Sequence, residues 1–201
     1  MRLEEALADR RSVRRFDGRP VPPDVVRDLI ALACTAPAPH HSRPWRFLAV
    51  DSAEAREGLA ETMARRWRHD LEGDGVPQAE VARLLDRSYR RLREAPLLLL
   101  ACIVLDQARS WPDERRRRAE RDMFVQSLGA ALQNLMLAAH ARGLGSCLMG
   151  APLFCPDAVV EALGLPPEYE PQFLVTMGYP PPGSRPPPRP ELRADDFLLH
   201  R

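Results

Sequence analysis

The sequence predicts a mixed α/β layer structure, in which helices cover a sheet. Short apolar runs with strand character alternate with stretches, often in pairs, whose apolar residues recur at helical spacing. The 201 residues are enough for one domain with a buried core. No G-x-G-x-x-G and no G-x-x-x-x-G-K-[ST] pattern follows a strand, which argues against a Rossmann fold and a P-loop.

In the N-terminal half, proline and serine mark the element boundaries. Pro20–Pro23 form a turn before a helix, Ser52 is a typical helix N-cap, and Pro96 introduces an apolar strand. The predicted elements are helices at Leu3–Arg10, Asp24–Thr35, Ser52–His69 and Gln78–Glu94, and strands at Trp45–Val50 and Leu97–Leu105.

In the C-terminal half, a polar segment precedes the longest predicted helix. We expect Asp106–Arg118 to be a loop or lid, because it is polar and contains Trp111-Pro112 and four consecutive arginines. The predicted elements after it are helices at Ala119–Arg142 and Pro156–Leu163, and strands at Ser146–Met149 and Phe173–Tyr179. A single domain at 1–201 is predicted. Its proline-rich arm at 180–201 is too stiff and polar to build a core, so it must lie on its own domain or on a partner subunit.

Composition excludes several classes of protein. A hydrophobic content of 45% with 28% charged residues fits a folded globular protein. The net charge of +1 gives no global reason to expect a nucleic-acid or membrane partner. The N-terminus does not resemble a signal peptide, and the longest apolar run, Leu97–Leu105, is too short to cross a bilayer. We therefore expect a cytoplasmic protein. The four cysteines include no C-x-x-C pair and are expected to be mostly buried thiols.

The segment Arg10-Arg11-Ser12-Val13-Arg14 is the first candidate for chemistry. Guanidinium forks, a hydroxyl and free backbone N–H groups at a helix end suit a phosphate monoester. The alternative is a solvated cap, because cations favour helix C-termini.

A stiff loop, TAPAPHHSRPWRF, follows the second predicted helix. His40 and His41 are not expected to bind metal, because no acidic or cysteine partner lies at ligand spacing. They are expected either to hydrogen-bond an anionic or carbonyl-rich ligand or to be plain surface residues. The roles of two further segments are each open between two interpretations. The glycine-rich segment Gly143–Pro152 either lets the backbone approach a ligand closely or simply ends a helix. The run Glu114–Arg121 is either a solvated helix face or a surface that steers a substrate.

Together these motifs resemble the flavin-dependent nitroreductase family over essentially the whole chain. The resemblance lies in the arginine segment with Phe16, in Pro20-Val21-Pro22, and in Ala36-Pro37 followed by Pro44-Trp45-Arg46-Phe47. Gly143-Leu144-Gly145-Ser146 and Gly178-Tyr179-Pro180 then follow in the same order. It implies an α+β nitroreductase-like fold with a central mixed sheet flanked by helices, in an intertwined homodimer that binds FMN at the subunit interface.

The resemblance also implies roles for individual residues. Arg10, Ser12 and Arg14 would grip the FMN phosphate and ribityl chain, with Arg11 close by and Arg185 or Arg189 closing on the same phosphate. The backbone around Leu148, Met149 and Gly150 would face the flavin ring from the other subunit. Where most members carry Asn and Gln before the Pro-Trp, this chain has His41 and Arg43, which place extra positive charge at the flavin edge.

One branch of the family is closer than the rest. APAPHHSRPWRF, Glu120–Phe124 and Gln133–His140 resemble the FMN-binding C-terminal domain of the actinobacterial coenzyme F420:L-glutamate ligase. That resemblance implies reduction of dehydro coenzyme F420-0, or a related deazaflavin, at its enolpyruvyl side chain. The substrate carries a carboxylate and a phosphodiester, so a cationic pocket would aid binding. The candidate substrate residues are His40, Arg43, Arg65, Arg66 and Arg68, with His40 or His41 as proton donor.

Two alternative functions remain beside the reduction of dehydro coenzyme F420-0. One is a general NAD(P)H-dependent nitro- or quinone reductase. The other is a flavin- or deazaflavin-binding module without turnover. The reductant of the FMN is not identified by the sequence.

Overall fold

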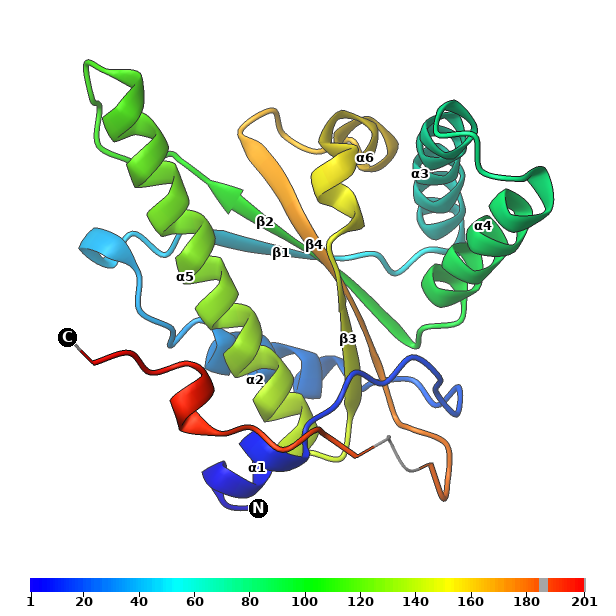
Figure 1. The fold of residues 1–201 in the computed structure, drawn as a ribbon, viewed down its shortest axis with the longest axis horizontal. Helices are drawn as coiled ribbons and strands as arrows, with labels where there is room; N and C mark the ends of the chain where they lie inside the picture. Colours follow the sequence, from blue (N-terminus) through cyan, green and yellow to red (C-terminus); the bar gives the residue numbers. More distant parts are fainter. Residues whose placement is uncertain (185–187, 201) are drawn as a thin grey trace.

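The computed structural model describes residues 1–184 and 188–200, and its centre is a four-stranded sheet with the strand order β1-β2-β4-β3 (Figure 1). The strands are β1 (Trp45–Ala49), β2 (Leu97–Val104), β3 (Gly145–Met149) and β4 (Tyr169–Gly178). All three ladders are antiparallel. In the described part of the chain, the one parallel pairing is an isolated bridge between Ser12 and Ser146. The α+β class is confirmed, but the sheet is antiparallel and not mixed.

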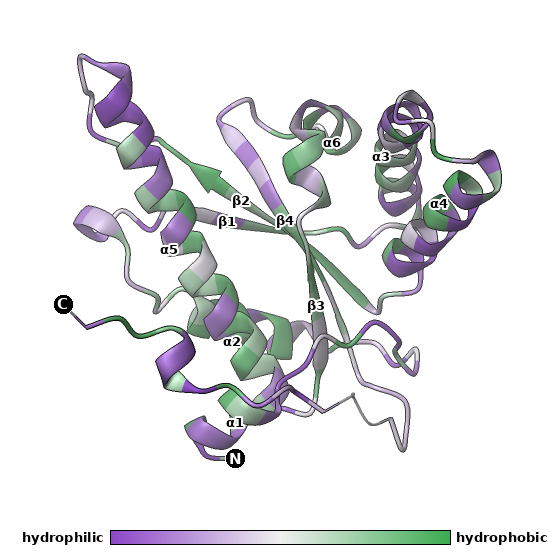
Figure 2. Cartoon of the chain, viewed as in Figure 1, coloured by the Kyte–Doolittle hydropathy of each residue, from purple (hydrophilic) through white to green (hydrophobic). Residues whose placement is uncertain are grey.

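The strand β2 is buried on both faces and divides the core in two. Leu97, Leu99 and Ile103 belong to one apolar cluster, and Leu98 and Leu100 belong to the other. Because successive side chains of a strand point to opposite faces, a strand covered on both sides must be apolar throughout. Figure 2 shows β2 as one of the most hydrophobic parts of the chain.

Helices cover both faces of the sheet. One face packs against α2 (Pro23–Ala33) and α5 (Glu114–Ala141). The other face packs against α3 (Ala53–Gly73), α4 (Gln78–Arg93) and α6 (Pro156–Leu163). Figure 1 shows these two sets on opposite sides of the sheet, with the short α1 (Leu3–Asp9) near the C-terminal end of α5. The predicted helices and strands are thus present, with shifted ends.

The largest shift is at the start of α5, where the predicted loop or lid at Asp106–Arg118 is partly wrong. The helix begins at Glu114, so the four arginines lie in its first turns. The Asp113 side chain accepts a hydrogen bond from the backbone N–H of Arg116 at 2.9 Å and caps the helix. Ion pairs of Arg116 with Asp113 and of Arg117 with Glu114 follow at i, i+3 spacing. Charge pairing along the helix therefore stabilises a segment that lacks apolar periodicity.

The N-terminal segment lies along the edge strand β3. The backbone N–H of Val13 donates to Ser146 O at 2.9 Å, and the N–H of Asp17 donates to Tyr179 O at 2.9 Å. Gly145 permits this approach, because a Cβ added there would lie 2.5 Å from the Val13 Cβ. The contact aligns the arginine segment with the start of β3.

The C-terminal arm has little regular structure. It contains one 3₁₀ turn at Ala194–Asp196, and the Arg189 guanidinium donates to Arg10 O at 3.0 Å. Phe197 and Leu199 are 73% and 85% exposed. The arm therefore contacts its own domain at Arg10, while its apolar tip lies open. None of the helices in the described residues is long and apolar enough to span a bilayer.

We predict that Gly145→Ala lowers the free energy of unfolding by about 1–3 kcal/mol, because the new methyl group overlaps Val13. Thermal or urea unfolding measures the change. Gly129→Ala is the control, since that exposed helical glycine has no atom within 4 Å of an added Cβ. It is expected to be neutral or stabilising. Equal stability of Gly145→Ala and the unmodified protein would contradict the close approach.

Candidate functional site

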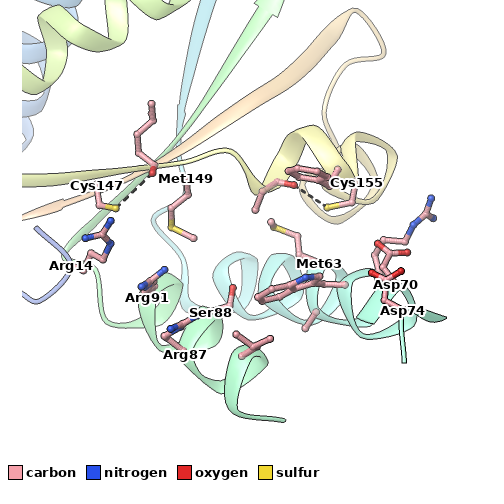
Figure 3. Close-up of a pocket in the computed structure, with 17 residues that line it drawn as sticks. Arg14, Met63, Asp70, Asp74, Arg87, Ser88, Arg91, Cys147, Met149 and Cys155 are labelled. Atoms are coloured by element: carbon pink, nitrogen blue, oxygen red, sulfur yellow. Dashed lines mark hydrogen bonds between the residues drawn. The ribbon is translucent and has the colours of Figure 1, made fainter. Parts of the chain in front are cut away.

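A cavity of about 530 Å³ lies between α3, α4, β3 and the N-terminal segment (Figure 3). Its walls are mostly apolar, with Met63 and Trp67 from α3, Leu148 and Met149 from β3, and Phe154 after β3. Its volume is in the range of cavities that hold cofactors and drug-sized ligands. Figure 3 shows arginines at one end and Asp70 and Asp74 at the other.

Three arginines, Arg14, Arg87 and Arg91, line one end of the cavity; we call them the inner arginine cluster. No carboxylate in residues 1–184 and 188–200 forms an ion pair with any of them within 4.0 Å. Burial lowers the pKa of Arg91, and the charge of Arg14 lowers it further. Like charges gathered at an apolar wall attract an anion.

A second group, Arg10, Arg11 and Arg189, forms the outer arginine cluster. Burial lowers the pKa of Arg10, and the charges of Arg189 and Arg11 add to that effect. In the described residues this cluster also lacks a carboxylate partner within ion-pair distance. Ser12, beside it, is exposed. The group is suited to an anion with several oxygens. Arg185, the other candidate on the arm, lies outside the described residues.

The structure brings several predicted cofactor residues together within one chain. Arg14, Leu148 and Met149 of one chain line the same cavity, whereas the resemblance implied that the strand residues approach the flavin from the other subunit. The reason is the docking of the N-terminal segment on β3. Gly150 directly follows the end of β3, and a Cβ added to it would lie 3.5 Å from the Phe173 ring.

Of the three predicted substrate arginines on α3, one reaches the cavity. Arg66 lines it and lies 3.7 Å from Asp157. Arg65 donates instead to Thr62 Oγ1 at 3.1 Å, and Arg68 lies 3.9 Å from Glu72. Arg65 and Arg68 thus do not line this cavity, because their positions lie on other sides of the helix, and their role as remote substrate contacts stays a prediction.

Sequence reasoning missed Arg87 and Arg91. These two residues share one face of α4 with Leu84 and Ser88, at spacings of three and four, and all four line the cavity. The signal available in the sequence was this stripe of arginines on a helix of otherwise mixed charge. Such a stripe does not by itself show whether the helix face lines a cavity or faces solvent.

The loop Pro39–Arg43, called here the His40 loop, lies away from the cavity. None of His40, His41 and Arg43 lines it, and the loop packs on the α5 side of the sheet (Figure 1). All three residues have positive φ, at 55°, 57° and 50°. Left-handed backbone at such residues costs roughly 1–3 kcal/mol each and persists only where the surroundings hold it. Ser42, between them, is buried.

One buried carboxylate, Glu120 on α5, contacts this loop. It accepts hydrogen bonds from the backbone N–H of Arg109 at 3.2 Å and from Trp111 Nε1 at 3.3 Å, and its Oε1 lies 3.8 Å from His40 Nε2. The Arg109 hydrogen bond lowers the pKa of Glu120 most. Burial opposes it, while Trp111, His40 and the Arg109 charge also lower it.

The comparisons with known proteins place the chain in a family. The model of the nitroreductase family matches residues 7–179. The chain belongs to the nitroreductase family. It is 31% identical over 185 residues to an iodotyrosine deiodinase of Drosophila melanogaster, covering 89% of this chain and 62% of the deiodinase, so it spans less than two thirds of that relative. A Bacillus subtilis protein with the provisional name NAD(P)H nitroreductase YfhC is 27% identical, covering 89% of this chain and 84% of the relative.

Solved structures agree on the fold. A BluB-like flavoprotein of Clostridium difficile superposes with a TM-score of 0.77 at 24% identity, covering 100% of this chain and 99% of the other. Family membership confirms the predicted nitroreductase-like fold. Members of the family are FMN-dependent oxidoreductases, which confirms the predicted enzyme class and cofactor.

We predict that the contribution of Glu120 to stability depends on pH. Because its folded pKa is lowered, the contribution is fully present above the ordinary glutamate pKa of about 4.3 and is lost as the pH falls through the folded value. Glu120→Gln should lower the free energy of unfolding by about 1–3 kcal/mol at pH 7 and by less near pH 3. Urea titrations at both pH values measure this, with Glu54→Gln, at an exposed position without an ion pair in the described residues, as control. An unfolding difference that is the same at both pH values would refute the assignment.

Proposed function

We propose that the chain binds FMN between the two arginine clusters and reduces a small, anionic, conjugated substrate. The observation that supports this most is the pair of arginine clusters, one lining an apolar cavity and one beside it, for which residues 1–184 and 188–200 supply no carboxylate partner. Bound FMN supplies hydride transfer between an electron donor and the substrate.

The residues present fit FMN by charge and by shape. Arg10 and Arg189, with the Ser12 hydroxyl, would hold the phosphate, because charge-assisted bidentate hydrogen bonds suit its oxygens. Arg14 and Arg91 would face the more electronegative edge of the flavin ring. The β3 backbone at Leu148 and Met149 would lie against the ring, with Gly150 leaving room beside it.

The cavity walls determine how strongly the inner arginine cluster acts. Met63, Trp67 and Met149 form an apolar wall on one side of it, while Arg14 and Arg87 remain exposed to solvent. Charges in such surroundings interact more strongly than charges in bulk water, and their positions require no reorganisation during the reaction. Arg14 and Arg91 thereby stabilise negative charge that develops at the cavity wall.

We further propose a homodimer in which the His40 loop of each chain reaches the cavity of the other. In one chain, His40, His41 and Arg43 lie on the opposite side of the sheet from the inner arginine cluster. A partner subunit would supply them at the cavity mouth, where Arg43 offers charge to an anion and either imidazole can donate a proton. The exposed apolar tip of the arm, at Phe197–Leu199, supports association.

Within this proposal, the substrate is dehydro coenzyme F420-0 or a related deazaflavin. Its carboxylate and phosphodiester match a cationic loop and cavity, and its enolpyruvyl double bond is conjugated to the carboxylate. The support is the cationic His40 loop and the resemblance of its sequence to the F420 branch of the family. Cytoplasmic location, where this cofactor would be made, follows as part of the same proposal.

A general NAD(P)H-dependent nitro- or quinone reductase is the second candidate. The Bacillus subtilis relative carries such a name, and the aromatic residues Trp67 and Phe154 at the cavity would suit a flat uncharged substrate. A binding module without turnover would share the same cavity.

The proposed function predicts a mass gain of about two daltons when the FMN-loaded protein, with a chemical reductant, is incubated with dehydro coenzyme F420-0, because two hydrogens add to the double bond. Mass spectrometry measures it, and protein without FMN is the control. Turnover of nitrofurazone or menadione with NADPH, without that mass gain, would favour the second candidate. Flavin binding without either reaction would favour the binding module.

The outer arginine cluster predicts a loss of FMN affinity in Arg10→Ala. Removing one charge-assisted anchor of the phosphate costs roughly 1.5–3 kcal/mol, which is about one to two decades in Kd. Flavin fluorescence quenching measures the affinity. Arg15→Ala is the matched control, because this exposed arginine lies just outside the segment and should leave the affinity within about twofold. Equal affinities of the two variants would show that the phosphate lies elsewhere.

A further inference from the structure

Glu120 connects two loops that are far apart in the sequence. Its side chain is 4% exposed, and it is one of few buried charged residues in the described part of the chain. It contacts the loop before α5 through Arg109 and Trp111, and it contacts the His40 loop through His40. The guanidinium of Arg109 also lies 3.3 Å from His40 Nδ1, so each ring nitrogen of His40 faces a charged side chain.

Two features show that this contact does more than fill space. A buried carboxylate is costly unless it is paired, and Glu120 has two N–H donors and a histidine within reach. The His40 loop has left-handed backbone at His40, His41 and Arg43, a conformation that is uncommon for residues other than glycine, although histidine adopts it more often than most, and here it occurs at three of five positions. An external contact must therefore maintain it, and Glu120 and Arg109 are the polar groups that reach His40.

We propose that Glu120 is a positioning residue, which holds the His40 loop in its left-handed conformation and so orients His40, His41 and Arg43 toward an anionic substrate. Nothing in this role requires Glu120 to touch the substrate. The contacts within one chain support the part of this proposal that concerns the orientation of the loop. Its effect on catalysis rests on the function proposed above.

The alternative is a purely structural role, in which Glu120 only stabilises the fold. A structural residue would affect all substrates alike, through the amount of folded protein. A positioning residue acts on the loop cations, so it would change the KM of an anionic substrate more than that of a neutral one. The charge of the substrate therefore separates the two roles.

The first experiment measures the loop contact without any activity. The chain has three tryptophans, so ¹⁵N-tryptophan labelling gives three indole N–H signals, and Trp111→Phe identifies that of Trp111. In Glu120→Gln the Trp111 signal should move, because the carboxylate acceptor is lost, while those of Trp45 and Trp67 stay in place. Glu54→Gln, at an exposed position on α3 without an ion pair in the described residues, should move none of the three. An unmoved Trp111 signal in folded Glu120→Gln would overturn the proposal.

The second experiment measures KM and kcat with the FMN-loaded protein. For dehydro coenzyme F420-0, Glu120→Gln should raise KM about tenfold with kcat within about threefold of the unmodified protein. For menadione, which is neutral, KM should change by less than about twofold. Equal changes for both substrates would assign Glu120 a purely structural role.

A double-mutant cycle measures whether the effects of Glu120 and His40 on KM are coupled. If Glu120 acts through His40, the rise in KM of Glu120→Gln combined with His40→Gln should be smaller than the product of the single effects. If the two substitutions raise KM by the product of their single effects, Glu120 does not act through His40. Should Glu120→Gln fail to fold, Trp111→Phe removes only one donor to Glu120 and should raise KM for the anionic substrate in the same direction. If the unmodified protein turns over neither substrate, the proposed function fails, while the indole measurement still tests the position of Glu120.

Discussion

The docking of the N-terminal segment on the edge of β3 is the contact on which the candidate site depends. One backbone hydrogen bond, from Val13 to Ser146, and the missing side chain at Gly145 set the distance between the segment and the strand. This places Arg14 at the cavity wall with Leu148, while Arg10 lies away from the cavity, near the C-terminal arm. A shift of the segment by one residue would turn Arg14 away from the cavity and bring a neighbouring side chain to its place, since successive side chains of an extended chain point in opposite directions.

The two arginine clusters are unfavourable in the protein alone, because like charges repel and burial lowers the pKa of Arg10 and Arg91. An anion that lies between them relieves both effects. Such a ligand binds the folded state and not the unfolded chain, so it adds to the stability of the fold as its concentration rises above Kd. The cofactor and the N-terminal segment are therefore expected to stabilise each other, since the segment carries three of the six arginines in the two clusters.

Sequence patterns predicted the features that depend on local chemistry. The caps at Ser52 and the prolines before α2 and β2 marked boundaries, and the uniformly apolar β2 indicated a strand buried on both faces. The prediction of a mixed sheet was wrong, because helical connections often return the chain to a parallel strand, whereas here they end on antiparallel neighbours. The start of α5 was missed since ion pairs, and not apolar periodicity, stabilise its first turns. Arg87 and Arg91 were missed because a helix face alone does not show what packs against it.

The position of the His40 loop separates two functions that the sequence placed in one site. The sheet lies between this loop, on the α5 side, and the cavity, on the α3 and α4 side. A single chain thus offers cofactor-binding arginines on one face and a held cationic loop on the other. Because the contacts of Glu120 fix the loop through groups of its own chain, the loop does not need a partner in order to keep its shape. A surface already ordered in the free protein binds with less entropy cost. The strained backbone of the loop and the buried carboxylate of Glu120 therefore belong together. The contacts of Glu120 offset the cost of the left-handed backbone, and the cations of the loop remain available at the surface.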